Sequence, residues 1–286
     1  MKRRLKKQLP AMLGLGSVLM AAMGGMGYMG FKAASQATAD ALGCYVDKPQ
    51  RQTFIFVDAS GPRFNDEQRR SLQSYFDQLY AGLGFNERLS VYTNEADQVA
   101  SVARPRFTLC GPARSAADLE AINAPSANAG YLRKERERLY TKVLAPELRV
   151  LLAEDVPESR TQHYQSPILE MIADLSRDPA MRPGSRLIVI SDLLQNSDTA
   201  QFCRVKGDMP RFAVFARRQD FERVKPESLN GVEVEVLMIQ RYGYGRAGME
   251  YCRDEEELRD FWRDYFIGAG VREPSFIRIR HGIIGG

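Results

Sequence analysis

Residues 53–58 read TFIFVD, a run of five apolar or β-branched residues that ends in an aspartate. A continuous run of this kind is typical of a strand buried on both faces in the centre of a parallel sheet. Residues 186–192 read RLIVISD and repeat the pattern later in the chain. The two stretches predict two central strands, each followed by a carboxylate, Asp58 in the first and Asp192 in the second.

The segments around these two strands alternate between helix and strand patterns. Apolar residues recur at helical spacing in residues 65–83, 129–152 (with an interruption near Pro146), 167–175, 212–223 and 254–267. Further strand patterns occupy residues 89–93, 106–110, 232–240 and 275–280. Strands that alternate with helices predict a doubly wound, mostly parallel α/β sheet with helices on both faces. We expect residues 53–286 to form this single domain.

The N-terminus predicts a membrane anchor. Residues 11–31 are 21 uncharged, mostly apolar residues that follow a basic tail, residues 1–10. About 20 such residues cross a bilayer as a helix. The basic flank predicts a cytoplasmic N-terminus, so the domain is expected outside the bacterial inner membrane, in the periplasm, after a linker at residues 32–52. A cleaved signal peptide is the alternative, and it exports the same domain.

The charge distribution bears on the kind of partner. The formal net charge is +4, but residues 1–40 contain six basic residues and one acidic residue. Residues 41–286 therefore have a formal net charge of about −1. They have no excess of the basic residues that nucleic-acid binding requires. We expect no nucleic acid and no small-molecule substrate. A protein partner and the membrane remain.

The four cysteines suit an exported domain. They are Cys44, Cys110, Cys203 and Cys252. An even number of cysteines in an exported chain permits two disulfides, here in three possible connectivities, and free buried thiols are the alternative. None belongs to a C-x-x-C pair, so the spacing does not favour a zinc site.

The two strand-end aspartates predict a metal site. In a doubly wound sheet, ligands bind at the carboxyl ends of the strands where the strand order reverses. Ser60 follows Asp58 closely, and Ser166 stands just before a predicted helix. Carboxylate and hydroxyl oxygens suit Mg²⁺, Ca²⁺ or Mn²⁺. Asp58, Ser60, Ser166 and Asp192 are the predicted ligands; turn and helix-cap roles are the alternative.

The order of these motifs resembles the von Willebrand factor A (VWA) family over about residues 53–280. The carrying residues are Asp58-x-Ser60, then Ser166, then RLIVISD ending at Asp192. The resemblance implies a metal-ion-dependent adhesion site, in which D-x-S-x-S, a later threonine and an aspartate after the fourth strand bind the ion. Ser166 would replace the threonine. More narrowly, the chain resembles bacterial membrane-anchored proteins of this fold.

Two positions depart from the family pattern. Pro62 stands where D-x-S-x-S has its second serine, so one oxygen ligand is missing. Leu193 stands where the family's T-D-G has glycine, since the local sequence is Ser191-Asp192-Leu193. The first departure puts metal binding in question and leaves a vestigial site as an alternative.

Catalysis is not favoured by the sequence. The chain has two histidines, His163 and His281, and no G-x-S-x-G elbow or P-loop accompanies them. The enzyme alternative is a haloacid-dehalogenase-like phosphohydrolase, but its D-x-D motif would need an aspartate where Ser60 stands. We therefore expect a binding module for a protein partner. A structural subunit of a membrane complex, with residues 242–245 (YGYG) as a contact loop, is the competing interpretation.

Overall fold

The computed structural model describes residues 36–59, 64–94, 104–152, 165–203, 209–240 and 255–280. Within them, six strands form one sheet in the order β3-β2-β1-β4-β5-β6. The strands are β1 (Gln52–Val57), β2 (Arg88–Thr93), β3 (Phe107–Cys110), β4 (Arg186–Ser191), β5 (Glu233–Ile239) and β6 (Ser275–Ile279). Neighbouring strands are parallel, except that β2 and β3 are antiparallel. The prediction of a mostly parallel α/β sheet is confirmed.

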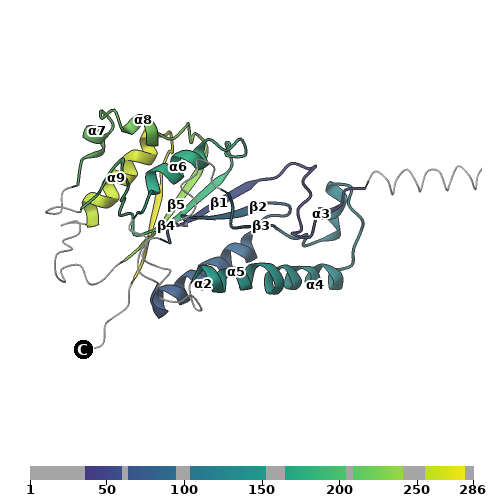
Figure 1. Cartoon of the computed structure of the whole chain (residues 1–286). Coiled ribbons are helices and arrows are strands. Elements are labelled where there is room, and N and C mark those ends of the chain that lie inside the picture. Colours follow the sequence, from purple (N-terminus) through teal and green to yellow (C-terminus); the bar gives the residue numbers. More distant parts are fainter. Residues whose placement is uncertain are drawn as a thin grey trace, which may run out of the picture.

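Helices cover both faces of the sheet (Figure 1). One face carries α2 (Asp66–Gly82), α4 (Ala129–Leu139) and α5 (Ala145–Leu151), and the other carries α6 (Ile168–Ser176), α7 (Phe212–Phe215), α8 (Phe221–Val224) and α9 (Glu255–Gly268). Side chains alternate along β1, because Phe54 and Phe56 belong to one core cluster and Ile55 and Val57 to the other. Burial on both faces explains why this strand has a continuous apolar sequence.

The helical predictions were confirmed in part. The interruption expected near Pro146 within residues 129–152 is one π-helical turn, η1 (Tyr140–Leu144), between α4 and α5. Pro146 follows that turn, and proline cannot donate the backbone hydrogen bond that a regular helix needs there. The single helix expected over residues 212–223 is the short pair α7 and α8. A further helix, α3 (Ala116–Ala121), was not predicted.

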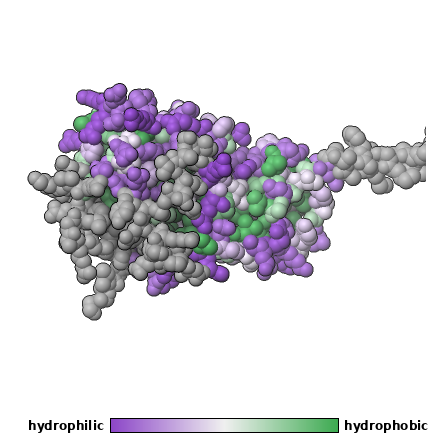
Figure 2. Space-filling model, viewed as in Figure 1, coloured by the Kyte–Doolittle hydropathy of each residue, from purple (hydrophilic) through white to green (hydrophobic). Residues whose placement is uncertain are grey.

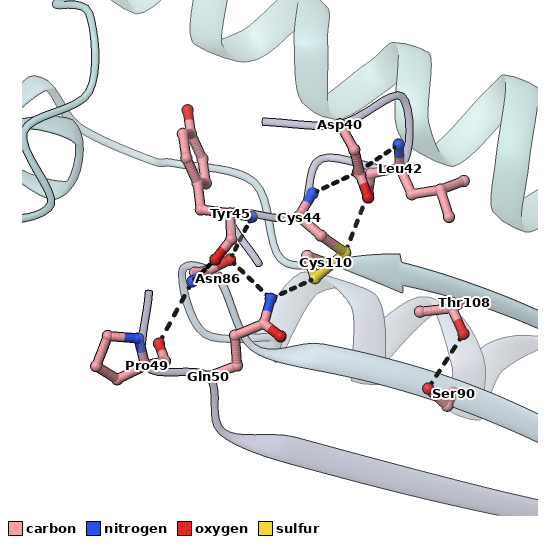
Figure 3. The surroundings of a disulfide bond; sticks show 10 residues. All are labelled: Asp40, Leu42, Cys44, Tyr45, Pro49, Gln50, Asn86, Ser90, Thr108 and Cys110. Atoms are coloured by element: carbon pink, nitrogen blue, oxygen red, sulfur yellow. Dashed lines mark hydrogen bonds between the residues drawn. A yellow bond between two sulfur atoms is a disulfide. The ribbon is translucent and has the colours of Figure 1, made fainter. Parts of the chain in front are cut away.

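The described part of the expected linker, residues 36–51, packs on the domain. A disulfide joins Cys44 to Cys110 at the end of β3, and the Tyr45 amide donates to Asn86 Oδ1 at 2.9 Å (Figure 3). The Ala37 amide also bonds the Asn123 carbonyl, at 2.9 Å. This disulfide selects one of the three connectivities. Cys203 is disulfide-bonded as well, and Cys252 lies outside the described residues.

The predicted membrane span lies outside the described part of the chain. That span, residues 11–31, and the basic tail before it have no description in the structure. Of the helices that are described, none combines the length and the apolar character needed to cross a bilayer.

The two ends of the parallel strands carry different groups. Cys110 pairs with Arg88, the first residue of β2, and Arg88 is level with Gln52, the first residue of β1. The disulfide therefore lies at the amino ends of the parallel strands, which we call the amino edge. Asp58 and Asp192 follow the last residues of β1 and β4 and lie at the opposite, carboxyl edge. A six-residue strand separates the two edges by about 20 Å.

Candidate functional site

The strand order reverses between β1 and β4, and the two predicted aspartates follow these two strands. β1 and β4 are parallel neighbours, with β2 and β3 on one side and β5 and β6 on the other. The Asp58 amide continues the pairing by donating to the Ile190 carbonyl at 2.8 Å. Asp58 and Asp192 thus stand on adjacent strand ends at the switch point, the place where doubly wound sheets bind ligands.

The Asp58 carboxylate is the centre of a buried polar cluster. Its Oδ1 accepts a hydrogen bond from Asn94 Nδ2 at 2.7 Å. Its Oδ2 accepts from Ser166 Oγ and from Ser191 Oγ, each at 2.8 Å. Asp58 is only 4% exposed, and a buried carboxylate requires such donors to replace water.

Asn94 has a second contact at the same place. Its side-chain oxygen accepts a 2.6 Å hydrogen bond from the Ala59 amide, next to Asp58. The asparagine follows β2 directly and is buried. It therefore fixes both the carboxylate and the backbone that follows it.

Ser166 is held in place by the turn that follows β4. Its amide donates to the Asn196 carbonyl at 2.7 Å, and the Asn196 amide donates back to the Ser166 carbonyl at 2.9 Å. This isolated bridge ties the segment before α6 to the segment after β4. The Ser166 hydroxyl is thereby directed at Asp58 although the two residues are far apart in sequence.

A fully buried glutamine, Gln195, reinforces that turn. Its side-chain oxygen accepts from the Leu169 amide in the first turn of α6 at 2.8 Å. Its side-chain nitrogen donates to Glu170 Oε2 at 2.9 Å, and Ser197 Oγ donates to Glu170 Oε1 at 2.6 Å. Every contact here joins α6 to the turn after β4, so the network fixes the position of Ser166.

Asp192 begins a tight turn. Its Oδ1 accepts a 3.1 Å hydrogen bond from the Leu194 amide, and its side chain is partly exposed. The next residue, Leu193, has a left-handed backbone (φ 64°), although its side chain is fully buried in the core. Trp262 Nε1 donates to the Leu193 carbonyl at 3.0 Å. The turn thus has the conformation that favours glycine, the residue found here in the VWA pattern.

The structure brings together some of the predicted ligands and leaves others undescribed. Asp58 and Ser166 are in direct contact, and Asp192 lies at the neighbouring strand end. Ser60 and Pro62 lie outside the described residues, as do both histidines and residues 242–245. The role of Ser60 as a ligand, and the effect of Pro62, therefore stay predictions.

Two residues of the cluster were missed by the sequence reasoning. Asn94 directly follows the predicted strand at residues 89–93, and Ser191 is the last residue of β4. Both stand at the carboxyl edge of strands next to β1, which is the signal that could have identified them.

The oxygen atoms of the cluster are of the type that hard divalent cations prefer. Asp58 and Asp192 have carboxylate oxygens, and a serine hydroxyl that donates a hydrogen bond to Asp58 still has lone pairs, although Ser191 Oγ uses one of them to accept from the Leu193 amide at 2.8 Å. Within the described ranges, no group of three or more histidine, cysteine, aspartate or glutamate side chains could hold a metal ion. A cation here would therefore rest on at most two described carboxylates, with Ser166 and Ser191 as neutral oxygen ligands.

Strand order and cluster together define an α/β domain with an oxygen-lined polar cluster at its switch point. No protein-family model and no curated protein matches the chain. Among solved structures, it is similar to an aerotolerance-related membrane protein from Bacteroides fragilis NCTC 9343, crystallised with multiple mutations to serines. The identity is 13%, covering 80% of this chain and 90% of that chain, with a TM-score of 0.32.

Proposed function

We propose that the chain is a membrane-anchored binding module of the VWA type, which holds a protein partner at the carboxyl edge of its sheet. Asp58, Ser166, Ser191 and Asp192, with Ser60 as predicted, would bind a divalent ion there, Mg²⁺ or else Ca²⁺ or Mn²⁺. When bound, the ion would accept a carboxylate oxygen from the partner. The observation that carries the proposal is the buried Asp58 carboxylate, with serine hydroxyls from two separate parts of the chain on one of its oxygens.

The position of the cluster suits partner binding. The described chain enters the domain at the amino edge, where Cys44 is bonded to Cys110. The cluster lies at the carboxyl edge, the length of a strand away. A domain anchored through residues 11–31 would therefore present the cluster away from the bilayer, where a second protein can reach it.

The sequence at the cluster does not favour catalysis. The phosphohydrolase alternative uses the same strand-end aspartate as its nucleophile, and its D-x-D motif needs a second aspartate where Ser60 stands. The three hydrogen bonds on Asp58 hold its carboxylate in one orientation, which serves an ion ligand and a nucleophile alike. A structural subunit with a vestigial site is the stronger competitor, because it requires no ion and no use of the cluster.

Cross-linking in the membrane tests the proposal. The full chain is cross-linked in membranes from its own cells, with and without a chelator, and compared with Asp58→Asn and Asp192→Asn. We expect the cross-linked partner to be lost with the chelator and in both variants, and kept in the exposed control Glu273→Gln. Unchanged cross-linking in every case would favour the structural subunit. Turnover of a phosphoester that depends on Asp58 would favour the enzyme.

A further inference from the structure

A second surface feature lies at the amino edge, away from the Asp58 cluster. A cavity of 580 Å³ opens between residues 37–45, α3 and α4. Small and apolar side chains dominate its lining, among them Ala37, Tyr45, Leu119, Ala127, Leu132 and Leu139. We call this cavity the amino-edge groove. Figure 2 shows an apolar area at the end of the molecule that carries α3, bordered by hydrophilic residues.

The groove has little charge and an aromatic rim. Glu135 is the one charged residue in its described lining, and it is neutralised by Arg138 at 2.6 Å. Tyr131 belongs to the lining and is 58% exposed, so its ring lies on the rim. Val46, next to the lining residue Tyr45, is 67% exposed. This chemistry fits an apolar or amphipathic surface.

The groove is also close to the predicted membrane span. That span ends at Phe31, and Ala37 already lines the groove. Six residue steps reach about 20 Å at most. The headgroup layer on each side of the hydrocarbon core occupies roughly 5–8 Å of that distance. The groove therefore cannot lie far from the lipid surface.

The disulfide keeps the groove at that distance. Cys44 is fixed to Cys110, and the Cys110 amide donates to the Leu42 carbonyl at 3.0 Å. The Ala37 amide also donates to the Asn123 carbonyl at 2.9 Å, so both ends of residues 37–44 are held on the domain and the connection to the span stays short.

We propose that the amino-edge groove and its rim dock on the lipid surface of the bilayer in which the chain is anchored. This inference rests on the proposed membrane anchoring. Tyr131 would lie at the level of the lipid headgroups, where tyrosine rings are enriched in membrane proteins because one end is apolar and the other polar. The short reach from Phe31 is what favours lipid over a partner protein. The domain would then stand with its amino edge on the membrane and the Asp58 cluster facing away.

Lipid quenching of an introduced tryptophan tests the docking. The full chain is reconstituted into phosphatidylcholine–phosphatidylglycerol vesicles, either unmodified or brominated in their acyl chains. Tyr131→Trp places the probe on the rim, and Val214→Trp is the matched control. Val214 is 56% exposed and lies on α7, at the other end of the molecule from α3 (Figure 1). The native Trp262 is fully buried, and the parent chain supplies its background signal.

If the groove docks on lipid, the Tyr131→Trp emission lies further to the blue in vesicles than the emission of an exposed tryptophan. It is also weaker in brominated than in unmodified vesicles. The Val214→Trp emission should show neither effect. Flotation of the vesicles separates the two possible failures. A chain that does not float would contradict the anchoring and, with it, the docking. A chain that floats without quenching at the rim would contradict the docking alone. A blue shift that grows with the protein-to-lipid ratio and is insensitive to bromine would assign the groove to a second copy and overturn the proposal.

Discussion

The hydroxyl of Ser166 donates a 2.8 Å hydrogen bond to Oδ2 of Asp58, although 108 residues separate the two in the chain. Ser191 donates to the same oxygen from the neighbouring strand. The buried carboxylate is thus the point where β1, β4 and the segment before α6 meet. Its environment makes the following predictions specific.

Loss of either hydroxyl should destabilise the domain. A hydrogen bond to a charged group contributes about 1.5–3 kcal/mol, so we expect Ser166→Ala and Ser191→Ala each to lower the free energy of unfolding by roughly that amount. Urea unfolding of the full chain in detergent measures it. The exposed Ser228→Ala is the control and should change stability by less than about 0.5 kcal/mol.

Ser166 and Asp58 should be energetically coupled. Ser166→Ala should have a smaller effect in the Asp58→Asn background than in the wild type, because the charged acceptor is already gone. Strictly additive effects in this double-mutant cycle would show that the contact between Ser166 and Asp58 does not contribute to stability.

Gln195 should contribute as much to the stability of the domain as an apolar core residue does, although it is polar. Gln195→Leu removes the partner of the Leu169 amide and one partner of Glu170, so we expect a loss of about 2–4 kcal/mol in stability. The exposed Gln78→Leu on α2 is the control, for which a near-neutral result is expected. Equal melting temperatures for the two variants would show that the Gln195 network does not hold Ser166 in place.

At Leu193, glycine should be tolerated at least as well as alanine, which is the reverse of the order expected within a helix. Truncating a buried leucine costs about 2–5 kcal/mol, but only glycine relieves the roughly 1–2 kcal/mol that a left-handed backbone imposes on other residues. We therefore expect Leu193→Gly to be at least as stable as Leu193→Ala. Leu169, equally buried but in α6, is the comparison, where glycine should be about 1 kcal/mol worse than alanine. The same order at both positions would contradict the turn geometry.

The disulfide at the amino edge should contribute strongly to stability. Cys44 and Cys110 are 66 residues apart, and closing a loop of that length stabilises by about 4 kcal/mol in the chain-entropy model. The double variant Cys44→Ser with Cys110→Ser should therefore melt well below the wild type under oxidising conditions. It should also reduce the lipid contact of the amino-edge groove, because residues 37–44 are no longer fixed. An unchanged melting temperature would mean that the segment packs equally well without the bond.

Much of the sheet could be predicted because its central strands are buried on both faces. The continuous apolar sequences of β1 and β4 reflect that burial directly, and the aspartates that follow them were placed correctly at one edge. The contact between Ser166 and Asp58 could not be derived, because it depends on the turn after β4 and on Gln195. The break near Pro146 was marked by its proline, whereas the α7–α8 interruption was hidden because it has no proline or glycine to mark it.

The amino edge shows the limit of composition as a guide. Residues 36–51 are small and polar and predicted a linker, but the disulfide and the Asn86 side chain hold them on the domain. Tertiary contacts of this kind leave no periodic pattern in the sequence.

The most direct test of the central claim is the effect of divalent ions on the melting temperature. The full chain in detergent is stripped with a chelator and melted with and without millimolar Mg²⁺, Ca²⁺ or Mn²⁺, beside Asp58→Asn and the control Glu273→Gln. An ion at about 100 times its dissociation constant stabilises by roughly 2.7 kcal/mol. We predict a rise in melting temperature for the wild type and the control and none for Asp58→Asn. No rise with any ion, or the same rise in Asp58→Asn, would contradict a metal site at the carboxyl edge.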